Sequence, residues 1–245
     1  MLDWQTFRNT HLQLPWLFQL VVGDRDFDRV LKGHPPSFHD YVQRAFQRCL
    51  WFWPRVIDAA PWAAGAVGKA ATPSNYMHID ADAQLLLNAV MEECPDRSAS
   101  LLDLGCNCGR HITYLAKQGY RNLAGVDVMS EAISLFARTE PEIFRRANIQ
   151  HDFFQRFLLR AADRQYDLTY SHGATIELVH PSFNVVEHIA NVTKSKICLL
   201  LHEKHGYPRD WISQFSHHGF VLKRSQPIHT NNSGVRLVVL HRALQ

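Results

Sequence analysis

A glycine-containing turn between an apolar segment and a helix-like segment is the part of the chain best suited to bind a ligand. Residues 101–104 read Leu-Leu-Asp-Leu, and the turn that follows them contains Gly105, Asn107 and Gly109. Asn is one of the few residues besides glycine that tolerate a positive φ. A dinucleotide-binding fingerprint would place glycines at 105, 107 and 110, but Asn107 and Arg110 occupy two of these positions. The turn therefore allows a ligand to approach the backbone without indicating NAD.

Carboxylates follow three successive apolar segments. Asp103 lies at the end of the first segment, Asp127 ends residues 123–127, and Asp152 follows residues 149–151. A carboxylate at a strand end can accept hydrogen bonds from both hydroxyls of a ribose, although NAD sites share this feature. Each residue alone could equally be a helix cap or a turn residue. Their occurrence at consecutive strand ends favours a ligand site.

In this order the segments resemble the motifs of the class I S-adenosylmethionine-dependent methyltransferases. The first motif of that family is an acid-x-Gly-x-Gly-x-Gly loop, in which the middle glycine is Asn107 here, and the resemblance covers about residues 76–245. It implies that the loop wraps the methionine portion and ribose of S-adenosylmethionine, and that Asp127 binds the ribose hydroxyls. It also implies that Asp152 pairs with the adenine amino group and that Phe153 covers the ring. The implied cofactor-binding set is Asp103, Gly105, Cys106, Asn107, Gly109, Asp127, Val128, Asp152, Phe153, Ser171 and His172.

Candidate catalytic residues follow the fourth and fifth predicted strands. Methyl transfer requires alignment of the reactants and, for a neutral hydroxyl, a base. Ligands of open α/β sheets bind outside the carboxyl ends of the strands. The candidates there are His172, His202, Glu203 and Glu177. His172 can act as a base or merely line the cofactor pocket, and Glu203 can orient or pair with an imidazole or amine.

Two absences narrow the chemistry. Residues 171–174 read Ser-His-Gly-Ala and lack the Asn/Asp-Pro-Pro-aromatic signature of enzymes that methylate base or glutamine nitrogens. Metal-dependent catechol-type enzymes carry an Asp at the end of the fourth strand, where Ser171 and His172 stand here. We therefore expect no metal ion and no nucleic-acid partner.

Helix-like and strand-like segments alternate from about residue 76 onward. This alternation predicts an α/β fold with a doubly wound, mostly parallel seven-stranded sheet. The last two strands have no helix between them and are expected to be antiparallel neighbours at one sheet edge. Strands are predicted at 100–104, 122–127, 149–152, 166–171, 197–202, 220–225 and 235–241, and helices at about 80–93 (capped by Asp80 or Asp82), 110–118, 130–137, 183–191 and 208–218.

The first 75 residues differ from the rest of the chain. They are rich in Trp, Phe and Pro and poor in strand-like alternation, and residues 39–53 carry apolar side chains at helical intervals. We therefore expect two units: a helical, substrate-binding lid at 1–75 and the S-adenosylmethionine-binding domain at 76–245.

Composition excludes several other classes of protein. With 245 residues, of which 46% are hydrophobic and 20% charged, the chain is expected to be globular and not disordered or a coiled coil. The formal net charge of +3 arises without a long run of one sign. The five cysteines lack paired C-x-x-C spacings, which favours reduced thiols in a cytoplasmic protein. No apolar run approaches the ~20 residues of a membrane span, so no membrane partner is expected.

The sequence thus predicts a cytoplasmic methyltransferase, monomeric or homodimeric, that uses S-adenosyl-L-methionine and acts on a small-molecule methyl acceptor. O-methylation is placed ahead of N-methylation. A catalytically silent scaffold that retains the cofactor is one alternative, which Asn107 in place of glycine favours. An RNA or protein substrate would be favoured if one basic face were formed by Arg44, Arg48, Arg145, Arg146, Lys194 and Lys196.

Overall fold

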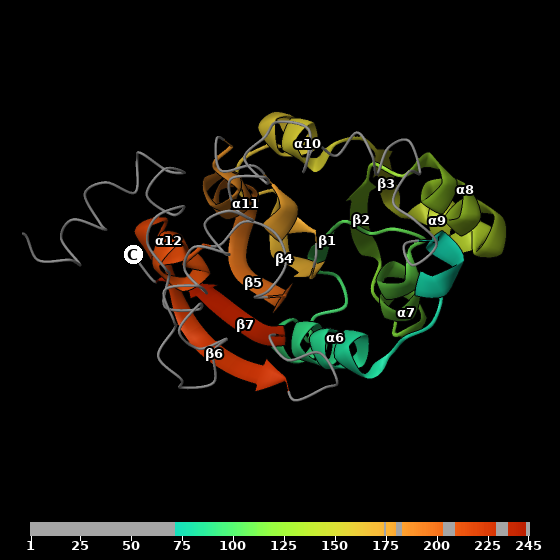
Figure 1. The fold of residues 1–245 in the computed structure, drawn as a ribbon. Helices are drawn as coiled ribbons and strands as arrows, with labels where there is room; N and C mark the ends of the chain where they lie inside the picture. The colour runs from blue at the N-terminus through green and yellow to red at the C-terminus, as the bar shows by residue number, and fades with distance from the viewer. Residues whose placement is uncertain (1–71, 174, 180–182, 203–208, 229–234, 244–245) are drawn as a thin grey trace, which may run out of the picture.

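The residues that the structure describes form one seven-stranded sheet with helices on both faces (Figure 1). The computed structural model describes residues 72–173, 175–179, 183–202, 209–228 and 235–243. The helix predicted at 39–53 and nearly all of the predicted lid lie outside the described residues. No helix among the described ranges has the length and apolar character needed to cross a membrane.

The strands are arranged in the order β3-β2-β1-β4-β5-β7-β6. The first five strands in this order pair in parallel, and β7 pairs antiparallel with both β5 and β6. This arrangement confirms the predicted doubly wound sheet and the antiparallel last strand. The strands are β1 (Ser100–Leu104), β2 (Asn122–Asp127), β3 (Asn148–His151), β4 (Tyr166–His172), β5 (Thr193–His202), β6 (Phe220–Ile228) and β7 (Val235–Arg242).

Two helical layers cover the sheet. One layer consists of α6, α7, α8 and α9, which share one core cluster with the sheet. The other consists of α10, α11 and α12, which share a second core cluster with the opposite face of the sheet. The two shortest helices of the middle region, α9 and α10, were not predicted, because six or seven residues are too few to show a helical period. The helices are α6 (Ala81–Glu93), α7 (Arg110–Lys117), α8 (Ser130–Thr139), α9 (Pro141–Arg146), α10 (Phe154–Arg160), α11 (Val185–Val192) and α12 (Trp211–His217), with 3-10 turns η2 (Pro73–Tyr76) and η3 (Ile176–Leu178).

The central strands are apolar on both faces because helices cover both faces of the sheet. In β1, Leu101 packs with the layer that contains α6 and α7, whereas Leu102 and Leu104 pack with the layer that contains α11. Successive side chains of a strand point to opposite faces, so Asp103 lies on the α7 side, fully buried. A charged residue at this depth indicates a specific polar partner.

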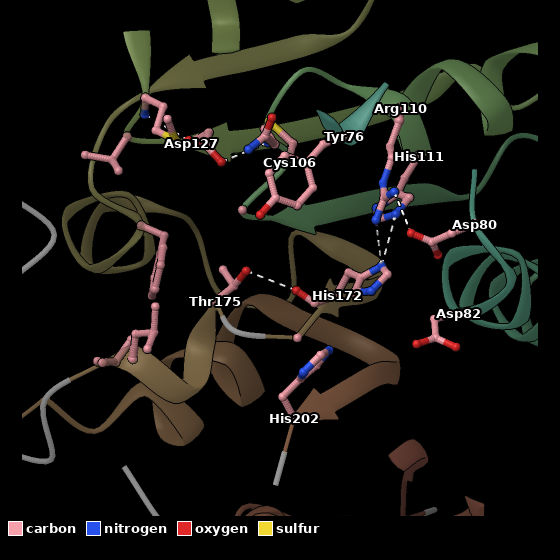
Figure 2. A pocket seen from close by; sticks show the side chains of 18 of the residues that line it. Tyr76, Asp80, Asp82, Cys106, Arg110, His111, Asp127, His172, Thr175 and His202 are labelled. Atoms are coloured by element: carbon pink, nitrogen blue, oxygen red, sulfur yellow. Dashed lines mark hydrogen bonds and ion pairs between the residues drawn. The ribbon is translucent and has the colours of Figure 1, made fainter. Parts of the chain in front are cut away.

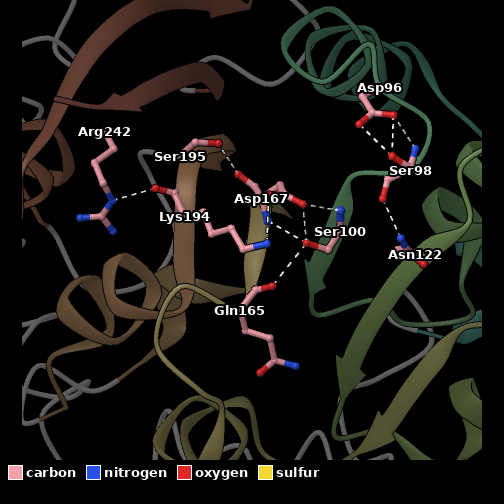
Figure 3. A network of polar contacts seen from close by, with 9 residues as sticks. All are labelled: Asp96, Ser98, Ser100, Asn122, Gln165, Asp167, Lys194, Ser195 and Arg242. Atoms are coloured by element: carbon pink, nitrogen blue, oxygen red, sulfur yellow. Dashed lines mark hydrogen bonds and ion pairs between the residues drawn. The ribbon is translucent and has the colours of Figure 1, made fainter. Parts of the chain in front are cut away.

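A polar network ties the amino-terminal ends of β1, β4 and β5 together (Figure 3). The carboxylate of Asp167 accepts hydrogen bonds from the backbone N–H and the hydroxyl of Ser100, at 2.8 and 2.6 Å. Lys194 Nζ lies 3.1 Å from the same carboxylate. Partial burial raises the pKa of Asp167, but these partners outweigh burial and hold it below its ordinary value. The network helps to set the register of the strands at the edge opposite the functional site.

Candidate active site

A cavity of about 320 Å³ opens at the carboxyl-terminal ends of β1, β2, β4 and β5 (Figure 2). This is the edge at which open α/β sheets bind ligands. The cavity is lined by Tyr76, Asp80, Asp82, Gly105, Cys106, Asn107, Arg110, His111, Asp127, Val128, Met129, Phe154, Gln155, His172, Gly173, Thr175, Leu178, Val179 and His202.

The loop between β1 and α7 forms one wall of the cavity. Gly105, Asn107 and Gly109 all have positive φ, at 80°, 46° and 72°. Asn107 therefore adopts the left-handed conformation that the sequence predicted for it. A Cβ atom on Gly105 would lie 2.3 Å from Thr175 Cγ2, and one on Gly109 would lie 2.4 Å from the Phe136 ring. Both glycines are required by close packing as well as by backbone conformation.

Asp127 ends β2 beside this loop and lines the cavity. Its Oδ2 accepts a hydrogen bond from the Asn107 backbone N–H and its Oδ1 accepts one from the Met129 backbone N–H, both at 2.8 Å. The carboxylate therefore joins the ends of β1 and β2. Burial raises its pKa above the ordinary value, against the opposing effect of these backbone N–H groups. Each carboxylate oxygen has a second lone pair with which it can accept a hydroxyl group.

Several residues of the predicted cofactor set do not line the cavity. Asp103 is fully buried below it, where its Oδ2 lies 3.4 Å from His111 Nδ1. Gly109 is the N-cap of α7 and packs against Phe136. Ser171 is buried and donates a hydrogen bond from its hydroxyl to the Leu104 carbonyl oxygen at 2.8 Å. These residues shape the edge of the sheet beneath the cavity wall.

Asp152 and Phe153 also lie outside the cavity lining, and Phe154 and Gln155 line it instead. The Asp152 carboxylate pairs with two arginines of α10, Arg156 at 2.7 Å and Arg160. The difference arises because β3 ends at His151 and α10 begins at Phe154, which leaves Asp152 and Phe153 in a two-residue connection ahead of the helix. The start of this unpredicted helix redirects the side chains that follow the strand.

His172 ends β4 and points into the cavity wall among groups from α6 and α7 (Figure 2). Its Nδ1 lies 3.2 Å from Arg110 Nη2 and 3.4 Å from His111 Nε2. Burial and the charges of His111 and Arg110 lower the pKa of His172 to about 3, despite the opposing charge of Asp80. The imidazole is therefore neutral near pH 7.

His202, the other predicted histidine, ends β5 and lines the cavity across from His172, with the two ring centroids 6.4 Å apart. Gly173 permits this approach, because a Cβ atom there would lie 2.1 Å from His202 Cδ2. Glu177 is buried and lies outside the cavity lining. Its carboxylate accepts hydrogen bonds from the backbone N–H groups of His202, at 2.7 Å, and Thr175, at 3.0 Å. It thus ties the β4 loop to the end of β5, whereas Glu203 lies outside the described residues.

Sequence reasoning missed the polar residues that reach the cavity from helix ends. Asp80 is the N-cap of α6, as the sequence allowed, but it also forms an ion pair with Arg110 Nη1 at 3.0 Å. Arg110 Nη1 donates a further hydrogen bond to the His78 carbonyl oxygen. The position of Arg110 directly after the glycine loop was the available signal, since the first residue of that helix must lie at the carboxyl edge of the sheet.

Comparison with known proteins defines the class. Residues 101–196 match the protein family described as "Methyltransferase domain". This match shows a methyltransferase domain over residues 101–196, and the strand order and the glycine loop are those of the class I fold. The family predicted from the sequence motifs is confirmed, and S-adenosylmethionine is the cofactor of that family. No curated protein matches the sequence significantly.

Solved structures share the fold at low sequence identity. Magnesium protoporphyrin IX methyltransferase (ChlM) from Synechocystis PCC 6803 with bound SAM has a TM-score of 0.54 and 13% identity, covering 94% of this chain and 96% of that one. A TehB-like SAM-dependent methyltransferase from Corynebacterium glutamicum has a TM-score of 0.51 and 20% identity, covering 76% and 96%. The [4+2]-cyclase SpnF has a TM-score of 0.53 and 14% identity, covering 66% and 82%. Because that protein is described as a cyclase, not every protein with this fold is described as a methyltransferase.

Proposed function

We propose that the protein is an enzyme that transfers a methyl group from S-adenosylmethionine to a small-molecule acceptor, with oxygen favoured over nitrogen. One observation carries the proposal. The cavity has the glycine loop and Asp127 on one side and two histidines, His172 and His202, on the other. A cofactor site and groups suited to proton transfer or hydrogen bonding therefore share one enclosure.

The residues of the cavity fit the cofactor. Gly105 leaves space where a side chain would meet Thr175, and Asp127 offers acceptor lone pairs to the hydroxyl donors of a ribose. Met129 and Phe154 supply apolar surface suited to an adenine ring. When bound, S-adenosylmethionine supplies an electrophilic methyl group on its sulfonium.

The acceptor would approach from the side of the two histidines. A neutral hydroxyl needs a base as it is methylated, whereas an amine or thiolate needs alignment alone. His202 lines the cavity and is our candidate for the base, with Glu177 holding its backbone in place. We also infer that residues 1–75 contribute to acceptor binding, since Tyr76, which directly follows them in the sequence, lines the cavity.

Three of the six basic residues that would favour an RNA or protein substrate form ion pairs among the described residues. Lys194 pairs with Asp167, Lys196 with Glu93 and Arg145 with Glu142. These ion pairs reduce the positive field that nucleic acid would require. Arg44 and Arg48 lie outside the described residues. This pattern supports the small-molecule proposal.

Calorimetry of the full chain with S-adenosylmethionine, its demethylated product and NAD tests the cofactor assignment. We expect heat of binding with the first two ligands and none with NAD. Mass spectrometry for methylated products, with hydroxyl-bearing and amine-bearing compounds offered in parallel, then tests the reaction. Binding of NAD alone would refute the assignment, and cofactor binding without turnover of any compound would support the silent scaffold.

A further inference from the structure

Four side chains from three elements meet at one wall of the cavity. Asp80 caps α6, Arg110 and His111 begin α7, and His172 ends β4 (Figure 2). The Arg110 guanidinium lies between an acid and an imidazole, with Nη1 3.0 Å from Asp80 Oδ2 and Nη2 3.2 Å from His172 Nδ1. Its side chain is only 9% exposed. Because water is largely excluded, the hydrogen bonds of Arg110 are electrostatically stronger than those of a surface arginine.

The direction of the Arg110–His172 hydrogen bond follows from the groups themselves. A guanidinium carries only donors and does not lose its proton in proteins. His172 Nδ1 must therefore accept, and its lone pair is occupied. In a neutral imidazole one nitrogen donates and the other accepts, so the ring proton of His172 lies on Nε2.

The His111 ring lies between His172 and the buried Asp103. Its Nε2 lies 3.4 Å from the same His172 Nδ1, and its Nδ1 lies 3.4 Å from the buried Asp103 Oδ2. Arg110 Nη2 is the closer of the two neighbours of His172 Nδ1, whose single lone pair accepts one strong hydrogen bond. His172 itself remains neutral, because burial and the nearby charges of His111 and Arg110 lower its pKa to about 3.

The free nitrogen of His172 is available to a ligand. Its Nε2 makes no hydrogen bond to any described residue, and the side chain lines the cavity. We infer that Arg110 is a positioning residue that holds His172 as the Nε2–H tautomer, so that His172 donates a hydrogen bond to the ligand and does not take a proton from it. The complementary ligand group is an oxygen acceptor, such as a carboxylate or a carbonyl. The tautomer stands independently of the proposed function; only the role toward a ligand rests on it.

Nitrogen-15 NMR of the full chain without ligand tests the tautomer directly. In long-range proton–nitrogen spectra, we expect His172 to show a protonated Nε2 and an unprotonated Nδ1 near pH 7. Arg110→Met removes the donor and its charge, so His172 should show both tautomers and titrate closer to its ordinary pKa of 6.5. Arg110→Lys keeps a charged donor and should restore the Nε2–H form. His241, which pairs with Glu93 away from the cavity, serves as an internal control for folding.

Two results would overturn the inference. One is a wild-type His172 protonated at Nδ1. The other is an Arg110→Met variant with folded spectra in which the His172 signals are unchanged. Neither result depends on cofactor binding, so failure of the inference is distinguishable from failure of the proposed function.

Kinetics test the donor role once an acceptor is known. Gln can also donate from its side-chain amide, whereas it has no basic lone pair that titrates near neutral pH. His172→Gln should therefore preserve the shape of the kcat/KM pH profile, and His172→Ala should raise KM by about tenfold, the usual effect of losing one good hydrogen bond. Loss of the acidic limb of the profile in His172→Gln would identify His172 as the base and refute the donor role.

Discussion

Replacing Asp127 with Asn is expected to weaken S-adenosylmethionine binding, whereas the same change at Asp152 is not. The two carboxylates end or follow neighbouring strands and are each 8% exposed, but Asp127 lines the cavity and Asp152 does not. They therefore form a matched pair. The family resemblance implied a cofactor role for both, but only Asp127 lines the cavity.

The expected magnitude follows from the contacts of Asp127. Both of its oxygens already accept backbone N–H groups, from Asn107 and Met129. An amide would place its NH₂ group against one of these donors or against a ribose hydroxyl. Losing a hydrogen bond to a charged acceptor costs about 1.5–3 kcal/mol, which corresponds to a Kd raised roughly 10- to 150-fold. Asp152→Asn removes contacts with two exposed arginines, for which we expect less than about 1 kcal/mol in folding and a Kd within about twofold.

Isothermal titration calorimetry with S-adenosylmethionine and its demethylated product measures both variants, after thermal denaturation shows that each is folded. Burial raises the pKa of Asp127, so affinity of the wild-type chain should fall on acidification at a higher pH than an ordinary Asp would require. The Asp127→Asn variant should lack this pH dependence. Equal losses in the two variants, or a greater loss for Asp152→Asn, would refute the assignment of Asp127 as the ribose-binding carboxylate.

Three further changes test contacts that support the site and the sheet beneath it. Glu177→Gln should lower the free energy of unfolding by about 2–3 kcal/mol in urea denaturation, because the two backbone N–H groups are accepted by different oxygens of Glu177 and one of these oxygens becomes an NH₂ donor in Gln; an unchanged midpoint would contradict this. Gly105→Ala should destabilise more than Gly219→Ala, because both have φ near +80° but only the former meets Thr175; thermal denaturation of the two variants measures the difference. Asp167→Asn should lower stability by about 0.5–1 kcal/mol near neutral pH. The pKa of Asp167 in the folded protein lies below its ordinary value of 3.8. The difference in stability should therefore disappear as the pH falls through this lowered pKa. A difference that persisted at lower pH would count against the network.

Local features of the sequence determined the elements and the conformation of the loop. The boundaries of β1 and β2 match the predicted ranges, because a short apolar run between turn residues is specified by neighbours along the chain. The left-handed conformation of Asn107 could also be foreseen, because it depends on the residue's own sterics. The ordered acids and glycines likewise sufficed to indicate the family and its cofactor.

The sequence pattern did not determine which side chains reach the cavity. Asp152 and Phe154 are two residues apart, and the start of a short helix places only Phe154 in the cavity lining. Arg110 and Asp80 are separated by 29 intervening residues, yet they meet because α6 and α7 pack on the same face of the sheet. Contacts of this kind depend on how elements pack, and neither periodicity nor turn propensity contains that information.

The tertiary structure also decided the protonation geometry of the site. From the chain alone, His172 was a candidate base because a histidine follows the fourth strand. In the fold, Arg110 occupies the lone pair of its Nδ1, and burial lowers its pKa and favours the neutral ring. The sequence therefore determined that a histidine stands at the end of the fourth strand. The chemical role of its imidazole depends on a hydrogen-bond donor and on burial away from water, which only the assembled helices and strands supply.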